Sequence, residues 1–373
     1  MPRFLHTADW QIGRQYPRFE PEDAAALAEA RITTVETIAA IAREERVDAV
    51  LVAGDVFDAQ TVSDRTIRRL FNALAAYPGP WFMIPGNHDA ALAESVWTRA
   101  QRLGAVPANA QLLLQPGVYA FEALGFAVLA APLTQRHTYG DLSDWFDRAE
   151  TAPGLLRIGL AHGSVQGVLA EDIDSPNPIA ADRVARARLA YLALGDWHGA
   201  KRIDERCWYS GTPEQDRFKD NGAGQVLLVD VPVDGSAPRV EPRRSGQYAW
   251  QAWQFRLDVD TDLDRLAQEL ERLAPQSVLQ LAIEGRLDLA GRQRLQEILA
   301  VAEARQRALL TDLSGLRLQP SESDIAALQA DGYVGDVLAE LRDRQADTAD
   351  ALAREALVIL AGLLGERAAG EAR

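Results

Sequence analysis

The sequence predicts an α/β protein with a largely parallel β-sheet covered by helices, followed by a smaller α+β domain. Over the first two thirds of the chain, short apolar segments alternate with helical patterns, and each apolar segment ends in glycine and polar residues. This rhythm changes near residue 245. We therefore expect a main domain over residues 1–245, an α+β domain over 246–320 and a helical tail over 321–373.

The first elements predict a β-α-β-α-β order. Residues 4–13, 48–57 and 81–89 contain short apolar, β-rich runs, which are typical of strands. Residues 63–77 lie between the last two and predict a helix, with Ser63 as its N-cap. One face of that helix is apolar, at Ile67, Leu70, Phe71 and Leu74. A similar stripe upstream consists of Ala28, Ile32, Val35, Ala39 and Ala42.

The following elements complete the main domain. Residues 111–132 predict hairpin strands, and residues 155–163 and 189–199 predict two more apolar strands that finish in His or Asp. Residues 224–233 predict a last strand. The segment 234–247 is rich in Gly, Pro and Ser and predicts a loop that leads to the domain boundary.

The rest of the chain predicts strand, helix, strand, helix and strand, followed by helices. The strands are expected over 248–260, 277–287 and 313–320. In the tail, one helix carries a broad apolar surface formed by Leu352, Ala356, Leu357, Ile359, Leu360, Leu363 and Leu364. This surface either packs back on its own small domain or receives a partner.

Composition restricts the class of protein. The chain has 373 residues, a hydrophobic content of 47% and a formal net charge of −15. It contains no apolar run long enough to span a bilayer, so we expect a soluble, cytoplasmic protein without membrane contact. The single cysteine, Cys207, excludes an intrachain disulfide and a cysteine-rich zinc site. The acidic charge argues against extended phosphate contacts, so any grip on nucleic acid must be local or supplied by a partner.

Polar residues gather where the predicted strands end. Four of the five histidines stand there beside an acid, an amide or a glycine, and the carboxyl ends of parallel strands meet at one edge of a sheet. Carboxylate, amide and imidazole groups suit divalent first-row metals, and a shared carboxylate bridges two ions about 3.5–4 Å apart. Such a pair predicts phosphoester hydrolysis. The candidate residues are Asp9, Gln11, Asp55, Asp58, Asn87, His88, His162, Asp196 and His198.

The ordered series D-x-Q, GDVFD, GNHD, HG and GDWH resembles the calcineurin-like metallophosphoesterase superfamily. The opening LHTADW, the GDVFD segment and the two-domain length most resemble the SbcD-like DNA repair nucleases. The likeness covers residues 3 to 230 well, and the remainder only in its general arrangement. It implies a four-layer core of β-sheets flanked by helices, with a smaller C-terminal capping domain.

The resemblance also implies two metal positions that share Asp55. The first is expected to take Asp9, Asp55 and His198, and the second Asp55, Asn87 and His162. Manganese is the expected metal, with magnesium as an alternative, because oxygen ligands are favoured over those that suit zinc.

The remaining roles implied by the resemblance concern catalysis and two substituted positions. His88 is expected to lie over the scissile phosphate, with Asp58 orienting its ring. His6 is expected to support the site or the fold. Gln11 stands where the family has D-x-H, and Asp196 where it has G-H-x-H. Both can still offer oxygen, which predicts a retuned site, although single-metal occupancy remains an alternative.

These observations predict a divalent-metal-dependent DNA nuclease that works in DNA repair with an SbcC or SMC-like coiled-coil ATPase. Two copies are expected to join the ATPase dimer, which would hold the DNA that this acidic chain repels. The site alone leaves two alternatives. One is a phosphodiesterase or phosphatase for a small phosphoester, and the other is a subunit that binds DNA or the ATPase without cutting.

Overall fold

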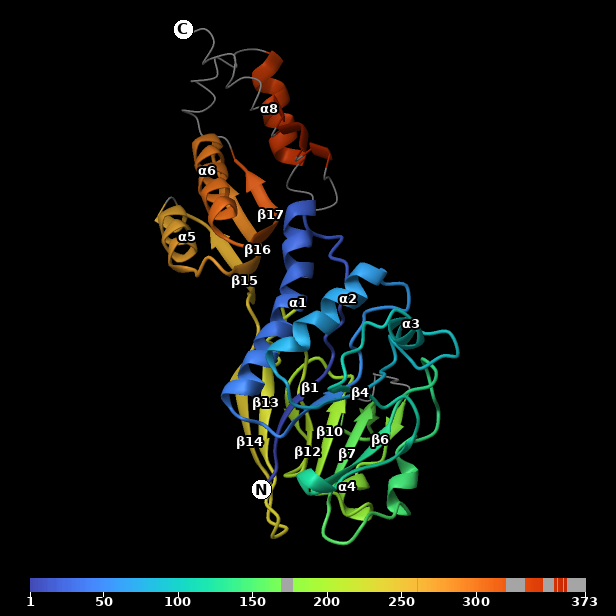
Figure 1. Ribbon diagram of the computed structural model, residues 1–373. Helices are drawn as coiled ribbons and strands as arrows, with labels where there is room; N and C mark the ends of the chain where they lie inside the picture. Colours follow the sequence, from blue (N-terminus) through green and yellow to red (C-terminus); the bar gives the residue numbers. More distant parts are fainter. Residues whose placement is uncertain are drawn as a thin grey trace. The chain divides into compact units, whose positions relative to one another are not determined.

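The computed structural model describes residues 1–168, 177–259, 261–319 and 333–344, together with 352–353, 355–357 and 359–360. The chain forms two compact units, Met1–Ala249 and Trp250–Arg373. Figure 1 shows the elements of both units, and the predicted α/β class is confirmed. No helix in the described ranges is long and apolar enough to cross a membrane.

The first unit contains two six-stranded sheets. In the first sheet the strand order is β14-β13-β1-β2-β3-β4, and β1 to β4 run parallel to one another. Strand β13 pairs antiparallel with β1, and β14 pairs antiparallel with β13. The strands are β1 (Arg3–Thr7), β2 (Ala49–Ala53), β3 (Trp81–Ile84), β4 (Ala110–Leu112), β13 (Gln225–Asp230) and β14 (Arg239–Arg244).

The second sheet has the order β11-β12-β10-β7-β6-β5. The hairpin expected over 111–132 is formed by β5 and β6, whereas β4 joins the first sheet beside β3. The strands are β5 (Gly117–Phe121), β6 (Phe126–Ala131), β7 (Leu156–His162), β10 (Tyr191–Gly195), β11 (Lys201–Arg202) and β12 (Cys207–Tyr209). Two short strands, β8 (Ser164–Val165) and β9 (Pro178–Ile179), pair separately.

Helices cover the outer faces of these sheets. The α-helices of the first unit are α1 (Pro21–Glu44), α2 (Asp64–Ala73), α3 (Val96–Arg102) and α4 (Arg183–Arg186). Short 3-10 helices are η1 (Leu74–Ala76), η2 (Glu122–Leu124) and η3 (Asp144–Asp147). Ser63 caps α2 by accepting a hydrogen bond from the Thr66 backbone N–H, as predicted. In Figure 1, α1 and α2 lie side by side over the first sheet.

Alternating side chains bind these layers together. On β3, Trp81 and Met83 face the helices, whereas Phe82 and Ile84 face the second sheet. A third apolar cluster lies on the far face of the second sheet and includes Phe146 of η3 and Val184 of α4. The first unit is thus built as helices, sheet, sheet and short helices, which is the four-layer arrangement that was expected.

Strand β14 differs from the prediction of a loop over 234–247. Residues Arg239 to Arg244 pair along their whole length with β13, although Pro242 lies in the middle of the strand. Proline lacks the N–H that a central strand needs, but β14 is at the edge of the sheet, where one side of the backbone faces outward. The proline that contributed to the loop prediction is therefore compatible with an edge strand.

His6 joins the two sheets from the middle of β1. Its ring is fully buried, with Nδ1 2.9 Å from the Tyr191 hydroxyl and Nε2 3.1 Å from the Leu194 main-chain oxygen. Burial lowers the pKa of His6 to about 3, so the ring is neutral at physiological pH. Both ring nitrogens have partners within the fold, and His6 is therefore a structural residue.

The second unit contains a three-stranded sheet, β15-β16-β17, and the expected strand and helix alternation is confirmed. Its elements are β15 (Ala249–Leu257), α5 (Thr261–Arg272), β16 (Ser277–Leu287), α6 (Leu289–Arg305), β17 (Ala308–Leu318) and α8 (Tyr333–Arg344). The core contains Leu266, Leu281 and Leu295, and a smaller cluster joins Leu318, Leu338 and Leu357.

The two sheets of the first unit approach each other most closely where β2 and β10 end. A Cβ built on Gly195 would lie 2.1 Å from the Ala53 main-chain oxygen and 2.8 Å from Nδ1 of His162. Backbone atoms cannot move aside as a flexible side chain can. Glycine at this position is therefore required by the packing of the sheets.

We predict that Gly195→Ala lowers the free energy of unfolding by about 1–3 kcal/mol, because the added methyl group overpacks a rigid contact. Gly140→Ala is the matched control, since its Cβ would meet nothing within 4 Å. Urea-induced unfolding of both variants measures the difference. Equal midpoints for Gly195→Ala and the unmodified chain would contradict the prediction.

Candidate metal centre

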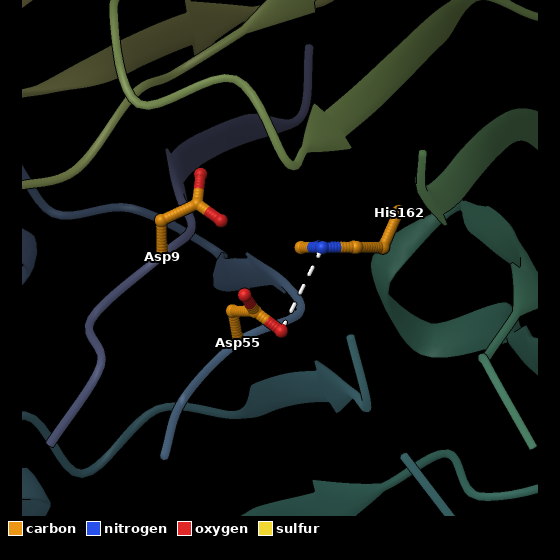
Figure 2. A group of neighbouring side chains, drawn as sticks. All are labelled: Asp9, Asp55 and His162. Atoms are coloured by element: carbon orange, nitrogen blue, oxygen red, sulfur yellow. Dashed lines mark ion pairs between the residues drawn. The ribbon is translucent and has the colours of Figure 1, made fainter. Parts of the chain in front are cut away.

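Three side chains from three strand ends converge in the first unit (Figure 2). Asp9 follows β1, Asp55 follows β2, and His162 is the last residue of β7. One ligand atom from each lies within 4.8 Å of the others, and His162 Nε2 is 3.6 Å from Asp55 Oδ1. Their exposed fractions are 0%, 2% and 2%, so the group is almost closed to solvent.

Burial and the charges within this group shift the pKa values of its members. Burial raises the pKa of Asp9 to about 6, against the opposing influence of His198 and His162. Burial alone would lower the pKa of His162, but the negative charges of Asp55, Asp9 and Asp196 outweigh it and raise the pKa to about 9. In the metal-free protein, the protonated His162 ring therefore balances the negative charges of the carboxylates. A bound metal cation can take over this role.

Asn87 provides a test of whether these residues fit a divalent cation. The tip of its amide lies 3.0 Å from His162 Nε2 and 3.1 and 3.2 Å from the two carboxylate oxygens of Asp55. With the amide nitrogen at the tip, these three contacts are hydrogen bonds donated by Asn87. With the amide oxygen at the tip, the same side chains instead offer an oxygen, an imidazole nitrogen and two carboxylate oxygens close together, which is a donor set that suits a divalent cation. The His162 Nδ1–H donates to the Ala53 main-chain oxygen (2.8 Å), so once the ring gives up its second proton, Nε2 is the nitrogen that offers a lone pair to a metal. The residues therefore fit a divalent cation.

The backbone around the group is in an unusual conformation. Asp9, Gln11, Asp55 and Asp196 have φ values of 55°, 44°, 53° and 104°. Non-glycine residues seldom adopt such values, and in folded proteins they concentrate at functional sites. The loops also pack so closely that no side chain fits at Gly86, since a Cβ there would lie 2.2 Å from Asp55 Oδ1.

Asp89, the last residue of GNHD, connects two of these loops. It was not identified as a site residue from the sequence. Its carboxylate accepts hydrogen bonds from the backbone N–H groups of Gly86 (2.7 Å), Val56 (2.9 Å) and Phe57 (3.1 Å). Burial, aided by the charge of Asp55, raises the pKa of Asp89 to about 7. Asp89 therefore fixes the loops that carry Asp55 and Asn87.

Asp196 and His198 follow β10 and border the buried group. The Asp196 backbone N–H donates to Asp9 Oδ1 (3.1 Å), and Asp196 Oδ1 lies 3.8 Å from His162 Nε2. His198 lies on the opposite side, beside Gln11. The structure thus brings together residues that the sequence separates by more than 180 positions.

A second buried carboxylate, Asp216, holds the His198 side and was also missed. Its Oδ2 accepts from Arg31 Nη2 (2.9 Å), pairs with Arg14 Nη1 (3.2 Å) and lies 3.4 Å from His198 Nδ1. Burial alone would raise the pKa of Asp216, but the hydrogen bond from His198 and the charge of Arg31 outweigh it and hold the pKa well below its ordinary value. Asp216 therefore remains charged and fixes the orientation of the His198 ring.

Gln11 takes part in this arrangement through its neighbours. Its amide oxygen accepts a hydrogen bond from Arg14, and its amide nitrogen donates to His198 Nε2 (3.1 Å). Gln11 and His198, which were expected at the first metal position, are thus hydrogen-bonded to each other, and Gln11 is also hydrogen-bonded to Arg14. The role of Gln11 as a metal ligand stays a prediction.

His88 and Asp58 lie at the outer edge of the group. The His88 Nδ1–H donates to the main-chain oxygen of Asp58 (2.8 Å), and His88 Nε2 is 4.0 Å from Asp55 Oδ2. The carboxylate of Asp58 lies instead 4.0 Å from Arg14. Asp58 thus contacts the ring of His88 through its main-chain oxygen and not through its carboxylate, and its role in orienting the ring stays a prediction.

A cleft of about 340 Å³ opens over these residues. The lining residues are Asp55, Asn87, His88, Asp196, Trp197, His198, Arg217, Lys219 and Asn221. The cleft exposes the edge of the metal-binding group beside a half-buried imidazole, while Asp9 and the body of His162 lie beneath its floor. The cleft therefore gives a phosphoester a route to the group.

Comparison with known proteins gives three relatives of similar sequence. The SbcD component of the nuclease SbcCD from Rhodobacter capsulatus is 29% identical over 375 residues, covering 86% of this chain and 88% of that protein. The protein of the same name from Bacillus subtilis is 27% identical, covering 61% of this chain and 66% of that protein. "DNA double-strand break repair protein Mre11" of Aeropyrum pernix is 28% identical, covering 70% of this chain and 64% of that protein.

The family model for calcineurin-like phosphoesterases matches residues 2–228, which is more than half of the chain. The match spans both sheets up to β13 and all of the strand ends that carry the buried group. The relatives above are similar in the same region and support the SbcD-like branch. With its four layers and its converging acids and imidazoles, the chain belongs to the calcineurin-like phosphoesterase family.

Proposed function

We propose that this protein is a divalent-metal-dependent phosphodiesterase that cleaves DNA. The observation that carries the proposal is the buried group of Asp9, Asp55 and His162 at the base of a cleft, with the amide of Asn87 at its edge. The names of the SbcD and Mre11 relatives support a nuclease in place of a phosphatase for small esters.

We assign the metal ligands as two sets that share Asp55. Asn87, His162 and Asp196 complete one set, and Asp9, His198 and Gln11 complete the other. The set with Asn87, His162 and Asp196 should bind its ion more tightly, because Arg14 and His198 already engage Gln11 of the other set. Oxygen-rich ligands favour manganese, with magnesium as the alternative. When bound, divalent ions lower the pKa of water and neutralise charge on a phosphoryl group.

The chain's own residues then position the substrate and move protons. His88 is held by the Asp58 carbonyl at Nδ1, so Nε2 is the nitrogen available at the cleft. We assign it to stabilise the charge on the scissile phosphate or to protonate the leaving oxygen. Asp216 and Arg31 keep His198 in place from beneath, and Asp89 keeps Asn87 in place.

We also propose a coiled-coil ATPase as partner, with two copies of this chain in the complex and a role in DNA repair. Two relatives are named as parts of SbcCD, which supports an assembly. In the tail, Leu357 packs into the cluster with Leu318 and Leu338, whereas Leu352 and Ile359 are 74% and 56% exposed. The helix therefore offers an apolar face beyond the one that packs on its own unit. Leu363 and Leu364 lie outside the described residues.

We predict that His88→Ala lowers the rate of DNA cleavage about 10²–10⁴-fold, because the side chain acts on the reacting phosphate. Manganese affinity should change little, since His88 is not assigned as a ligand. Labelled single- and double-stranded DNA, a nitrophenyl phosphodiester and a panel of divalent metals measure the activity. His137→Ala is the control, because His137 is exposed and does not line the cleft.

Three outcomes would overturn these assignments. If the unmodified protein cleaves only the small ester, the DNA substrate is wrong. If no metal in the panel supports cleavage of either substrate, the enzymatic function is wrong. If His88→Ala retains full activity, the role of His88 is wrong. Asp58→Asn preserves the main-chain carbonyl and should reduce activity by less than about tenfold.

We predict that binding of the manganese ion that His162 holds releases about one proton near pH 7.5, since a metal ligand must be neutral imidazole. The raised pKa of His162 means that the metal-free protein carries this proton below pH about 9. Affinity should therefore increase with pH up to that value. Titration calorimetry in buffers of different ionisation enthalpy counts the protons. A proton count of zero would show that His162 does not bind the metal.

We predict that changing both Leu352 and Ile359 to Asp lowers capture of a coiled-coil ATPase from the same organism at least about tenfold, since charges cannot enter an apolar groove. The variant retains Leu357 and so preserves the packed face of the helix. Val233→Asp, at a 72% exposed position of the first unit, is the control. Equal capture of all three proteins would place the contact elsewhere.

A further inference from the structure

Lysine is nearly absent from this chain, and the side chains of its two lysines lie close together. Of 39 lysine and arginine residues, only Lys201 and Lys219 are lysines. The ammonium groups of both lie over the ring of Trp197, at 5.3 and 5.6 Å from its centroid. Trp197 itself stands between Asp196 and His198, which border the metal centre. The two lysines therefore meet at Trp197, a residue that lines the cleft.

The two lysines differ in what surrounds them. Lys201 is half-buried, does not line the cleft and donates to the Val168 main-chain oxygen (3.2 Å). Lys219 is exposed and lines the cleft together with Trp197 and Asn221. Lys201 thus holds the indole ring on the protein side, and Lys219 places its charge at the cleft.

Trp197 is a fixed support for this charge. Its half-buried ring packs against the apolar cluster on the far face of the second sheet, which restricts its rotation. A cation near the face of a Trp ring is held by electrostatic attraction, which restricts the otherwise flexible lysine chain. An ammonium group carries three N–H donors, so it can bind a phosphate oxygen while it stays on the ring.

Arg217 also lines the cleft, but it is engaged by the site itself. Its guanidinium lies 3.2 Å from His198 Nδ1 and 3.5 Å from Asp216. Lys219 has no such acidic contact among the described residues. In a chain with a net charge of −15, Lys219 is therefore the cation best placed to receive an anion that enters the cleft.

We propose that Lys219, supported by Trp197 and Lys201, binds the phosphodiester that neighbours the scissile one. This inference rests on the proposed function and specifies its substrate as a polynucleotide strand with consecutive phosphates. A small phosphoester has no second phosphate to fill this subsite. Lys219 contributes affinity and register along the strand, whereas Trp197 and Lys201 are positioning residues.

The first experiment compares two substrates for Lys219→Met. The preference in kcat/KM for an oligonucleotide over bis(p-nitrophenyl) phosphate should fall about tenfold, mostly through KM, and the salt dependence of oligonucleotide binding should lose about one phosphate contact. Lys219→Arg should restore most of the preference. Arg202→Gln is the matched control, because Arg202 lies 5.8 Å from the Trp208 ring and does not line the cleft.

The second experiment uses the scarcity of lysine. Acetylation of the protein by an N-hydroxysuccinimide ester modifies only Lys201, Lys219 and the N-terminal amine, and mass spectrometry follows each one separately. A non-cleavable phosphorothioate oligonucleotide should protect Lys219 strongly and Lys201 weakly, with the N-terminal amine as the internal reference. Equal rates at Lys219 with and without the oligonucleotide would overturn the inference.

The two proposals fail in different ways. If the protein cleaves DNA but Lys219→Met keeps the substrate preference and Lys219 stays unprotected, the subsite is wrong and the nuclease function stands. If the protein cleaves no DNA, the nuclease function is wrong. Protection of Lys219 by the oligonucleotide would then still support the subsite, and its absence would overturn it.

Discussion

Two buried carboxylates of like charge, Asp9 and Asp55, lie together at the carboxyl edge of the first sheet, and the organisation of the first unit depends on holding them there. Removing a charge from water costs several kcal/mol unless partners satisfy it. Backbone N–H groups of Asp196 and His88 donate to these oxygens, and His162 adds a positive charge. The glycines, the tight loops and the second sheet together place these N–H groups and His162 close to the two carboxylates.

The residues that could be predicted from the sequence are those whose positions follow from where the strands end. Asp9, Asp55, Asn87, His162 and Asp196 each follow or end a short apolar strand, and parallel strands bring those ends to one edge. The β-α-β order and both flanking apolar stripes followed from period and composition alone. Strand β14 did not, because an edge strand tolerates the residues that define a loop.

The supporting residues could not be predicted in this way. Asp89 and Asp216 lie in loops, and their importance comes from partners that no local pattern reveals. Arg31 is a buried arginine in the middle of α1, and it meets Asp216 across 185 positions of the chain. The sequence likewise shows two lysines but not that the segment after β12 returns to Trp197. Such contacts depend on packing between distant segments.

The left-handed backbone at the metal centre also limits how the site can change during evolution. Asp, Asn and His are the non-glycine residues that adopt positive φ most readily, and the same three side chains bind metals. Asp196, at φ 104°, stands where the family pattern has histidine, and both residue types tolerate a positive φ. Gln11, at φ 44°, is outside this group and is the residue that Arg14 has drawn away. At the positions with positive φ, the backbone conformation therefore restricts which side chains can replace one another, independently of the metal that the site prefers.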